Sequence, residues 1–244
     1  MSEACVSVIV PARDLRPFIG EALASIQAQS RAVQEIIVID DASRDGTGEL
    51  LHEIARHEPR LRLLSGEGRG PAAARNLGLR AATSGIIAFL DGDDCWPRDK
   101  IERQMQRLDA ADRPDIVSGL IQRFRGFDSA TVAPADASGP ALPAASLAAC
   151  LFRRKVFQQI GLMDESLTWS DDHDLMLRAR EAGLRIAIMN HVTLYYRLRP
   201  GSLSHAAAAP PDFQMLEIVH RSLKRRRQAG TPLHLVPFTQ LMDP

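Results

Sequence analysis

An apolar segment of this chain leads directly into a cluster of carboxylates. Residues 86–90 are followed by Asp91, Asp93 and Asp94, and like charges this close together repel each other unless a cation neutralises them. An Asp-x-Asp pair at a strand end offers hard oxygen ligands for Mg²⁺ or Mn²⁺, which often complete their coordination with water and substrate phosphates. The pattern therefore indicates a divalent cation at Asp91 and Asp93, with an acidic turn as the plainer alternative.

Other charged residues have spacings that suit a nucleotide. Asp40 and Asp41 follow a second apolar segment, and a carboxylate at such a strand end can accept hydrogen bonds from a ribose hydroxyl or a base N–H. Arg75 stands near the start of a predicted helix, where it could counter Asp91 and Asp93 or bind a phosphate. A helix-capping turn and a surface salt bridge are the alternatives for these positions.

Acidic residues also open a later helix. The segment Asp171–Asp174 falls in the first turn of that predicted helix, where the helix dipole favours negative charge. The chemical alternative is that one of these carboxylates is a general base facing an acceptor hydroxyl. His173, within the segment, is better explained by a structural role than by metal binding.

Alternating strands and helices must position these residues. Apolar strands are predicted at 6–10, 35–41, 61–64 and 86–90, with helices at 17–29, around 50–54 and at 71–82. Continuous apolar strands separated by amphipathic helices predict an α/β fold whose mostly parallel sheet is covered on both faces. Ligands bind at the carboxyl ends of such strands, so this fold would gather the acids of both strand ends along one edge.

The second half of the chain continues with mixed elements. Helices are predicted at 99–108, before Gly161 and before Gly183, and strands near 115–118, at 184–190 and at 192–198. Residues 128–149 are rich in Ala, Pro and Ser, which favours a long surface loop, a mobile lid or a plain connector. A tail from about Gly201 carries the basic run Arg221–Arg227, which suits either an anionic membrane surface or a solvated helix face.

Composition narrows the class of protein. The 244 residues carry no formal net charge, so no global field indicates a nucleic-acid partner. Cys5, Cys95 and Cys150 are widely spaced, which predicts small buried hydrophobes in a reducing compartment. Neither a signal peptide nor an apolar stretch of ~20 residues is visible. We therefore expect a cytoplasmic protein that is either free or peripheral at the inner face of the membrane.

Five segments, taken in order, resemble glycosyltransferase family 2. They are VSVIVPARD, IIVIDDASRDGT, GPAAARNLGLRAATSGIIAFLDGDDCW, FRRKVFQQIGLMDE and SDDHDLMLRARE. The resemblance implies the GT-A fold, a Rossmann-like, mostly parallel central sheet flanked by helices, with a smaller sheet region on the acceptor side. It also implies a single domain over 1–200, divided into a nucleotide-sugar-binding half at 1–110 and an acceptor and catalytic-base half at 111–200. Residues 201–244 would form the tail.

The resemblance implies donor-binding roles for individual residues. Asp41 corresponds to the carboxylate that reads the nucleotide base, usually uracil, and Pro11 to Arg13 correspond to the loop that lines the base. Many relatives have an aromatic residue where Arg13 stands, although a guanidinium can also stack on a base. Arg75 corresponds to an arginine near the nucleotide.

The resemblance also implies a metal and a base. Asp91 and Asp93 correspond to the motif that binds the ribose and a divalent cation, Mn²⁺ or Mg²⁺, with Asp93 the closer match to the metal ligand. Asp172 corresponds to the catalytic base of a Glu-Asp pair, in which Asp171 replaces the first acid. Residues 195–205 resemble a segment that closes over the donor diphosphate, with an arginine, Arg197 or Arg199, as its phosphate partner.

The reaction implied is an inverting transfer from a nucleoside-diphosphate sugar, most simply a UDP-sugar. The acceptor would be a glycan, a lipid-linked sugar or a small molecule, in polysaccharide, glycolipid or cell-surface glycan synthesis. One alternative is a catalytically inactive module that binds nucleotide sugars. Another is a nucleotidyltransferase, but VPARDLRPFIG lacks the glycine-rich, basic loop that such enzymes carry after the first strand.

Overall fold

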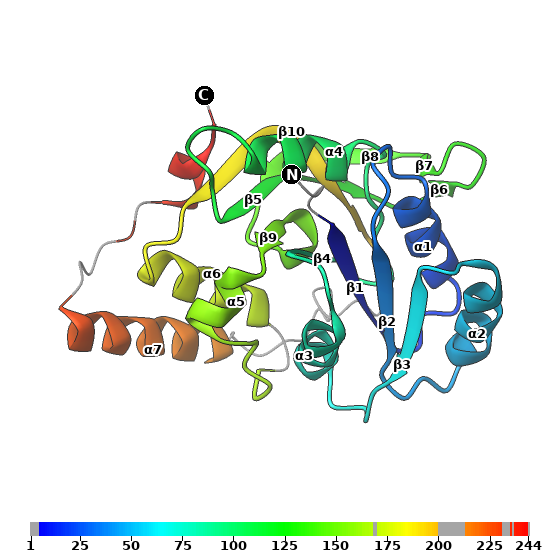
Figure 1. Ribbon diagram of the computed structural model, residues 1–244, viewed down its shortest axis with the longest axis horizontal. Coiled ribbons are helices and arrows are strands. Elements are labelled where there is room, and N and C mark those ends of the chain that lie inside the picture. Colours follow the sequence, from blue (N-terminus) through cyan, green and yellow to red (C-terminus); the bar gives the residue numbers. More distant parts are fainter. Residues whose placement is uncertain (1–4, 168–169, 200–212, 231–234, 236, 244) are drawn as a thin grey trace.

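The protein, seen as a computed structural model, is built on one large sheet (Figure 1), and the structure describes residues 5–167, 170–199, 213–230, 235 and 237–243. The strand order is β10-β5-β9-β4-β1-β2-β3, with β8 beside β5. These strands are β1 (Val6–Ala12), β2 (Glu35–Asp40), β3 (Leu61–Ser65), β4 (Ile86–Phe89), β5 (Ile116–Phe124), β8 (Ala137–Pro143), β9 (Leu151–Arg153) and β10 (Ile186–Arg197). Only β8 and β9 pair antiparallel in it, so the predicted mostly parallel sheet is confirmed.

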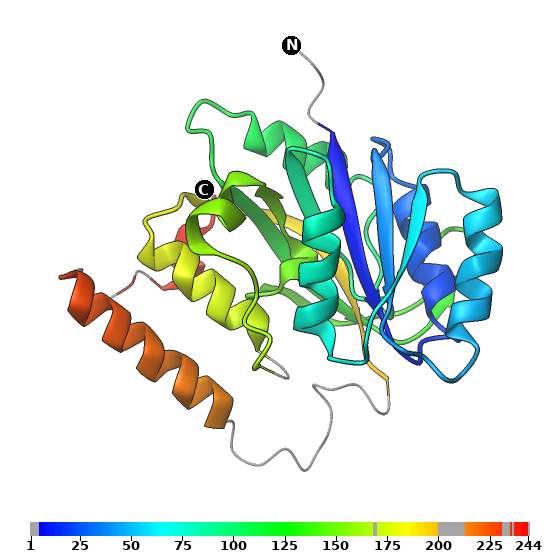
Figure 2. The ribbon, with the colours of Figure 1, turned by 60° about the horizontal axis from the view of Figure 1, so that its bottom comes forward.

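Helices cover both faces of the sheet (Figures 1 and 2). The first face packs against α1 (Ile19–Gln27), α2 (Thr47–His57) and α4 (Lys100–Leu108), and the second against α3 (Pro71–Ala81), α5 (Lys155–Ile160) and α6 (Asp171–Glu181). Successive strand residues point to opposite faces, so Val8 belongs to the first core and Ile9 to the second. Both kinds of position are apolar, which explains the uninterrupted apolar runs in the sequence.

The sheet reverses its strand order at β1, which has β2 on one side and β4 on the other. Both neighbours are parallel to β1, so their carboxyl ends lie at the same edge of the sheet. In open α/β sheets ligands bind in the crevice at such a switch point. The residues that follow β1, β2 and β4 begin at Arg13, Asp41 and Leu90, and they define this edge.

The prediction of two strands over 184–198 is wrong. β10 is a single strand beside β5, and its register shifts between Ile188 and Val192 and again between Val192 and Leu194. Extra residues in one strand of a pair form a bulge without ending the strand. The polar residues Asn190 and His191 lie in this irregular stretch, which is why the apolar pattern is broken although the strand continues.

The prediction of a long loop or lid over 128–149 is also wrong. β6 (Phe127–Asp128) and β7 (Ala133–Pro134) form a small antiparallel sheet, β8 pairs with β5, and the 3₁₀ helix η1 (Leu147–Ala149) is buried. Prolines are compatible with β8 because it is an edge strand. The long β5 supplies the pairing that this composition does not predict, and the small β6–β7 sheet confirms the expected smaller sheet region.

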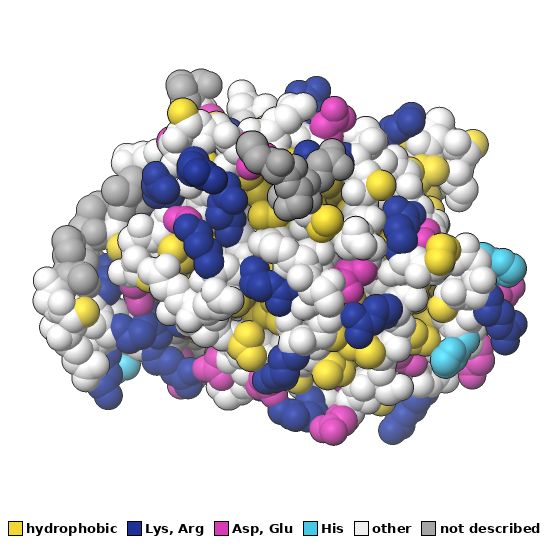
Figure 3. All heavy atoms as spheres, in the orientation of Figure 1, with side chains coloured by type: hydrophobic (Ala, Val, Ile, Leu, Met, Phe, Trp, Pro, Cys, Tyr) yellow, Lys and Arg dark blue, Asp and Glu magenta, His cyan; other side chains and the backbone are white. Residues whose placement is uncertain are grey.

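Two further features differ from the sequence-based expectations. Cys95 and Cys150 are buried as predicted, but Cys5 is exposed just before β1, so the prediction of a third buried thiol is wrong. On the face shown in Figure 3, Lys and Arg side chains of the described residues lie scattered among acidic and uncharged ones. This distribution agrees with the absence of net charge.

The helix α7 (Phe213–Ala229) packs beside α6 (Figure 2) and carries the basic run. Arg221 pairs with Asp164 at 2.7 Å and Arg225 pairs with Glu181 at 2.6 Å. Two of the cationic groups expected on the surface therefore bind other parts of the protein, and membrane contact by the run stays a prediction. None of the helices in the described part of the chain is long and apolar enough to cross a membrane.

Lys100, the first residue of α4, is completely buried. Its Nζ donates to Gln104 Oε1 at 2.5 Å and to the Cys150 carbonyl oxygen at 3.3 Å, and it lies 4.5 Å from the ring centre of Trp96. The described residues place no carboxylate in a salt bridge with it. Burial lowers the pKa of Lys100 to about 7, because desolvation disfavours the ammonium form.

We expect Lys100→Met to flatten the dependence of stability on pH. Between about pH 7 and the ordinary lysine pKa of 10.5, the unfolded chain holds a proton that the folded protein has released, so the free energy of unfolding rises with pH. The slope that Lys100 contributes is at most ~1.4 kcal/mol per pH unit. Urea denaturation at about pH 7 and about pH 8 measures it, with the exposed Lys224→Met as the control. A Lys100→Met slope equal to that of the wild type would contradict this account.

Candidate active site

Arg75 on α3 contacts two acids from distant parts of the chain. Its Nη2 donates to Asp91 Oδ1 at 2.5 Å, and its Nη1 donates to Asp171 Oδ2 at 2.6 Å. The side chains of Arg75 and Asp171 are only 8% and 6% exposed, whereas that of Asp91 is 36% exposed. One guanidinium therefore fixes the start of α6 against the segment that follows β4.

Direct ion pairs with Asp91 and Asp171 offset the charge of the buried Arg75. Burial alone would lower the pKa of Arg75, but Asp91 and Asp171 raise it above its ordinary value, so the guanidinium stays charged. The pKa of Asp91 is raised by burial and by the nearby Asp93, and Arg75 opposes that shift. Arg75 thus counters the acidic cluster as predicted, while its contact with a nucleotide stays a prediction.

Asp93 faces a different arginine, Arg199, which lies two residues beyond the end of β10. Arg199 Nε donates to Asp93 Oδ2 at 2.7 Å, and its guanidinium lies 5.2 Å from the ring centre of Phe18. The two side chains of the ion pair are 21% and 19% exposed. The predicted metal ligand is therefore paired with a cation of the chain itself, close to solvent.

The other arginine of this segment, Arg197, is buried. Its side chain donates to the Asp93 carbonyl oxygen at 2.7 Å and pairs with Glu21, and its guanidinium lies 4.5 Å from the ring centre of Phe124. Its backbone N–H donates to Asp94 Oδ1 at 2.9 Å. These contacts give Arg197 a structural role, so Arg199 is the better match to the predicted phosphate partner. Residues 200–205 of the expected closing segment lie outside the described residues.

Asp91 and Asp93 can bind a divalent cation if water and the substrate supply its other ligands. Arg75 contacts one oxygen of Asp91 and Arg199 contacts one oxygen of Asp93, which leaves a second oxygen on each. Among the described residues no group of three or more His, Cys, Asp or Glu side chains could hold an ion. A cation at Asp91 and Asp93 would take its remaining ligands from water and a donor diphosphate, as Mg²⁺ commonly does.

Asp41 fixes a glycine-rich loop at the same edge of the sheet. Its Oδ1 accepts hydrogen bonds from the N–H groups of Gly68 at 2.8 Å and Arg69 at 3.2 Å, and its Oδ2 accepts one from Gly70 at 2.8 Å. Arg13 donates from Nη1 to the Gly68 carbonyl oxygen at 3.1 Å. A carboxylate has about four acceptor positions, so Asp41 retains capacity for a base N–H beside Arg13.

Pro11 occupies a different place from the one predicted. It lies inside β1, buried and in register with Ile39 of β2, so its assignment to a loop is wrong. The pairing of β1 with β4 ends at Ile9, and a proline beyond that point costs no ladder hydrogen bond on that side. Arg13 is the first residue past the strand. Asp40, at the end of β2, accepts from the Ser43 N–H at 3.1 Å and thus stabilises a turn.

Asp172 is the accessible acid at the start of α6. Its side chain is 28% exposed, and its Oδ1 accepts from the His173 N–H at 2.7 Å and lies 2.8 Å from His173 Nδ1. Asp171, its neighbour, is buried against Arg75. The two adjacent carboxylates therefore differ in environment, and the one that can meet a substrate is the one predicted to be the base.

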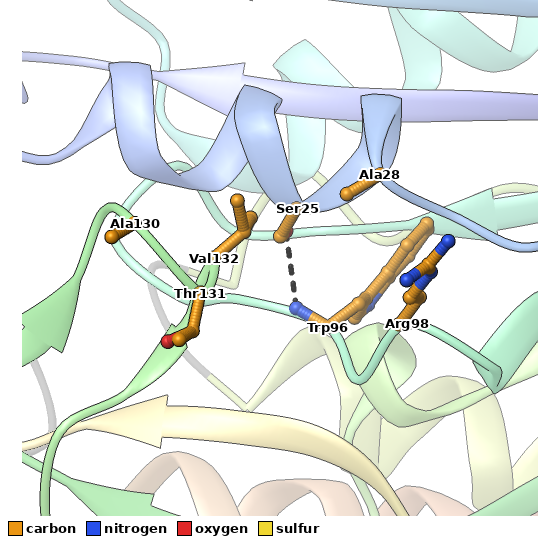
Figure 4. Close-up of a pocket in the computed structure, with 7 residues that line it drawn as sticks. All are labelled: Ser25, Ala28, Trp96, Arg98, Ala130, Thr131 and Val132. Carbon is orange, nitrogen blue, oxygen red and sulfur yellow. Dashed lines mark hydrogen bonds between the residues drawn. The ribbon is translucent and has the colours of Figure 1, made fainter.

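A separate pocket lies between the C-terminal end of α1 and the β6–β7 turn (Figure 4). It has a volume of about 250 Å³ and is lined by Ser25 of α1, by Ala28 just after that helix, by Trp96 and Arg98, and by the β6–β7 turn at 130–132. The backbone N–H of Trp96 donates to Ser25 Oγ at 3.1 Å. Its lining contains none of the predicted site residues, so this pocket is separate from the candidate site.

Comparison with known proteins identifies the family. The family model described as Glycosyl transferase family 2 matches residues 7–161, more than half of the chain. The chain belongs to this family. It is 33% identical over 220 residues to the succinoglycan biosynthesis protein ExoO of Rhizobium meliloti (strain 1021). That alignment covers 82% of this chain and 62% of ExoO, so the chain spans less than two thirds of this relative.

Solved structures agree on the fold of this family 2 member. S. aureus TarS 1–349 in complex with UDP-GlcNAc has a TM-score of 0.72 at 19% identity, over 94% of this chain and 68% of that one. The mannosyltransferase PcManGT from Pyrobaculum calidifontis, in complex with GDP-Man and Mn²⁺, has a TM-score of 0.64 at 22% identity, over 93% of this chain and 76% of that one. The predicted GT-A fold is thereby confirmed.

Proposed function

We propose that this chain is an inverting glycosyltransferase that moves a sugar from a nucleoside-diphosphate sugar to an acceptor hydroxyl. One observation carries the proposal: Asp172 is accessible at the start of α6, and its neighbour Asp171 is tied through Arg75 to Asp91. This bridge fixes a base candidate beside the acids that follow β4. A catalytic base must lie close to the reacting hydroxyl to be effective.

The donor would bind along the carboxyl ends of β1, β2 and β4. Asp41 and Arg13 would contact the base, with Pro11 buried behind them as part of the β1 scaffold. The solved relatives named above carry UDP-GlcNAc and GDP-Man, and both of these ligands are nucleoside-diphosphate sugars. We propose a UDP-sugar as the donor, on the resemblance of Asp41 to the residue that reads uracil.

Asp93, with Asp91, would hold a divalent cation, Mn²⁺ or Mg²⁺. When bound, the cation would neutralise charge that develops on the departing diphosphate. Arg75 holds Asp91 and Arg199 holds Asp93 after the same strand, and this arrangement supports the proposed role. Residues 1–110 would thus form the donor-binding half.

Asp172 would take the proton of the acceptor hydroxyl while that oxygen attacks the anomeric carbon. The bond from the anomeric carbon to the diphosphate breaks in the same displacement, and the configuration at that carbon inverts. The acceptor would approach from the half at 111–200 and would be a glycan, a lipid-linked sugar or a small molecule. The name of ExoO, a succinoglycan biosynthesis protein, supports a role in cell-envelope glycan synthesis.

A panel of nucleotide sugars tests this function against a catalytically inactive binding module. We expect one donor to release its nucleoside diphosphate slowly in water, faster with Mn²⁺ or Mg²⁺ than with EDTA. Asp93→Asn should reduce that release, because it removes a charged metal ligand. Binding of a nucleotide sugar without release, even when candidate acceptors are supplied, would favour the inactive module. No binding at all would contradict both.

A further inference from the structure

Two arginines surround the acids predicted to bind the metal, and they differ in what holds them. Arg75 is buried between Asp91 and Asp171, and its removal would break the scaffold. Arg199 forms its ion pair with Asp93 at the rim, where both side chains are partly exposed. Arg199 is therefore the cation that can change partners without unfolding the site.

We propose that Arg199 is a built-in cation that competes with a divalent metal for Asp93 while the donor is absent. The inference rests on the proposed function, because it names the regulation of that same site. Arg199 Nε lies 2.7 Å from Asp93 Oδ2, so a metal that binds this carboxylate lies close to the positive charge of the guanidinium. At such distances the repulsion between two cations is large even when solvent screens it.

The small number of protein oxygen ligands strengthens the competition between Arg199 and the metal for Asp93. A divalent ion needs six or more oxygen ligands, and in the described residues no cluster of three candidate side chains supplies them. An arginine binds one oxygen of each acid, Arg75 that of Asp91 and Arg199 that of Asp93, so the ion has to share both acids with an arginine, and of the two only Arg199 lies at the rim. The free protein should therefore bind metal weakly, and the donor diphosphate should bring both the missing oxygens and a second partner for Arg199.

The guanidinium of Arg199 is also suited to bind the donor diphosphate. Its planar set of N–H donors matches phosphate oxygens as well as carboxylates. Arg199 lies two residues beyond the last residue of β10, Arg197, which is anchored by contacts with the backbone of Asp93 and the side chain of Asp94. The base of the segment is thus fixed while the Arg199 side chain lies at the rim. This geometry allows exchange between Asp93 and an incoming phosphate.

Titration of Mn²⁺ without any nucleotide, followed by the EPR signal of the free ion, tests this inference. Arg199→Gln should lower the Kd for Mn²⁺ about tenfold or more, because the competing charge is gone. Arg199→Lys, which retains the charge, should stay near the wild type. Arg103→Gln is the matched control, since Arg103 also pairs with an aspartate, Asp99, but on the surface of α4. Adding Asp93→Asn to Arg199→Gln should abolish the gain.

Two outcomes would overturn the inference. The first is an unchanged Mn²⁺ affinity in Arg199→Gln and in a second neutral variant, Arg199→Met, with thermal unfolding as the check that both are folded. The second is an equal gain in Arg199→Lys, which would exclude charge as the cause. Since the titration contains no donor, it does not depend on turnover. A shifted Mn²⁺ affinity together with no activity on any nucleotide sugar would count against the proposed function alone.

Discussion

Asp172→Asn is expected to abolish sugar transfer while the protein still binds its donor. An amide has nearly the size of a carboxylate but cannot accept the acceptor's proton, and a positioned general base typically contributes a factor of about 10²–10⁴ to the rate. Asp172 lies on the exposed side of the start of α6, outside the buried Arg75 bridge. The substitution should therefore leave that bridge and the donor-binding residues in place. Transfer rates and donor Kd values, measured on the same preparations, check both parts.

Glu53→Gln is the control, because Glu53 is an exposed carboxylate on α2, far along the chain from the acids of α6. It should leave both the rate and the donor Kd unchanged. A fully active Asp172→Asn would exclude Asp172 as the base. Loss of donor affinity in proportion to the loss of rate would instead assign Asp172 to binding.

Arg75→Gln is expected to destabilise the fold by about 3 kcal/mol, at the low end for a broken buried ion pair. Asp171 would be left buried without its counter-charge, while the penalty at Asp91 is reduced because that side chain is 36% exposed. Activity should also fall, since Asp171 anchors the turn that carries Asp172. Urea denaturation gives the free energy of unfolding, and a transfer assay well below the transition gives the rate.

Arg103→Gln again provides the matched comparison, because it breaks an exposed arginine–aspartate pair. Such pairs contribute at most ~1 kcal/mol. Arg75→Lys should give an intermediate loss, because an ammonium retains the charge but lacks the rigid fork that contacts two carboxylates at once. If Arg75→Gln cost no more than Arg103→Gln, the bridge would not be the element that joins α6 to the end of β4.

Much of the fold follows from local pattern. The strands β1, β2 and β4 are apolar on both faces because two helical layers cover them, and that is the pattern a buried parallel sheet requires. β8 could not be predicted in this way, since its Ala, Pro and Gly residues form a strand only beside the long β5. The polar residues of the bulge in β10 interrupt the apolar pattern, so the sequence predicts two strands. The pairing with β5 tolerates this bulge and keeps β10 continuous.

The candidate site was predictable only in part. Asp41 and Asp91 follow parallel strands, so the topology alone brings them to one edge. The ion pairs that organise the site join Arg75 to Asp171 across 96 positions and Arg199 to Asp93 across 106. No local spacing encodes such a pairing, because the partner of a charged group is chosen by tertiary contact. The sequence therefore predicted the acids and the role of Arg75 as a counter-charge, but it did not predict that Arg75 pairs with Asp171 or that Arg199 pairs with Asp93.

In the proposed mechanism a single base, without a covalent intermediate, inverts the anomeric carbon of the donor. Time-resolved proton NMR of the sugar released from the hydrolysed donor tests this before mutarotation mixes the two anomers. The account predicts that the first sugar released has the anomeric configuration opposite to that of the donor. Release of a sugar that retains the donor configuration would contradict it, because a single displacement from the face opposite the leaving group must invert the anomeric carbon.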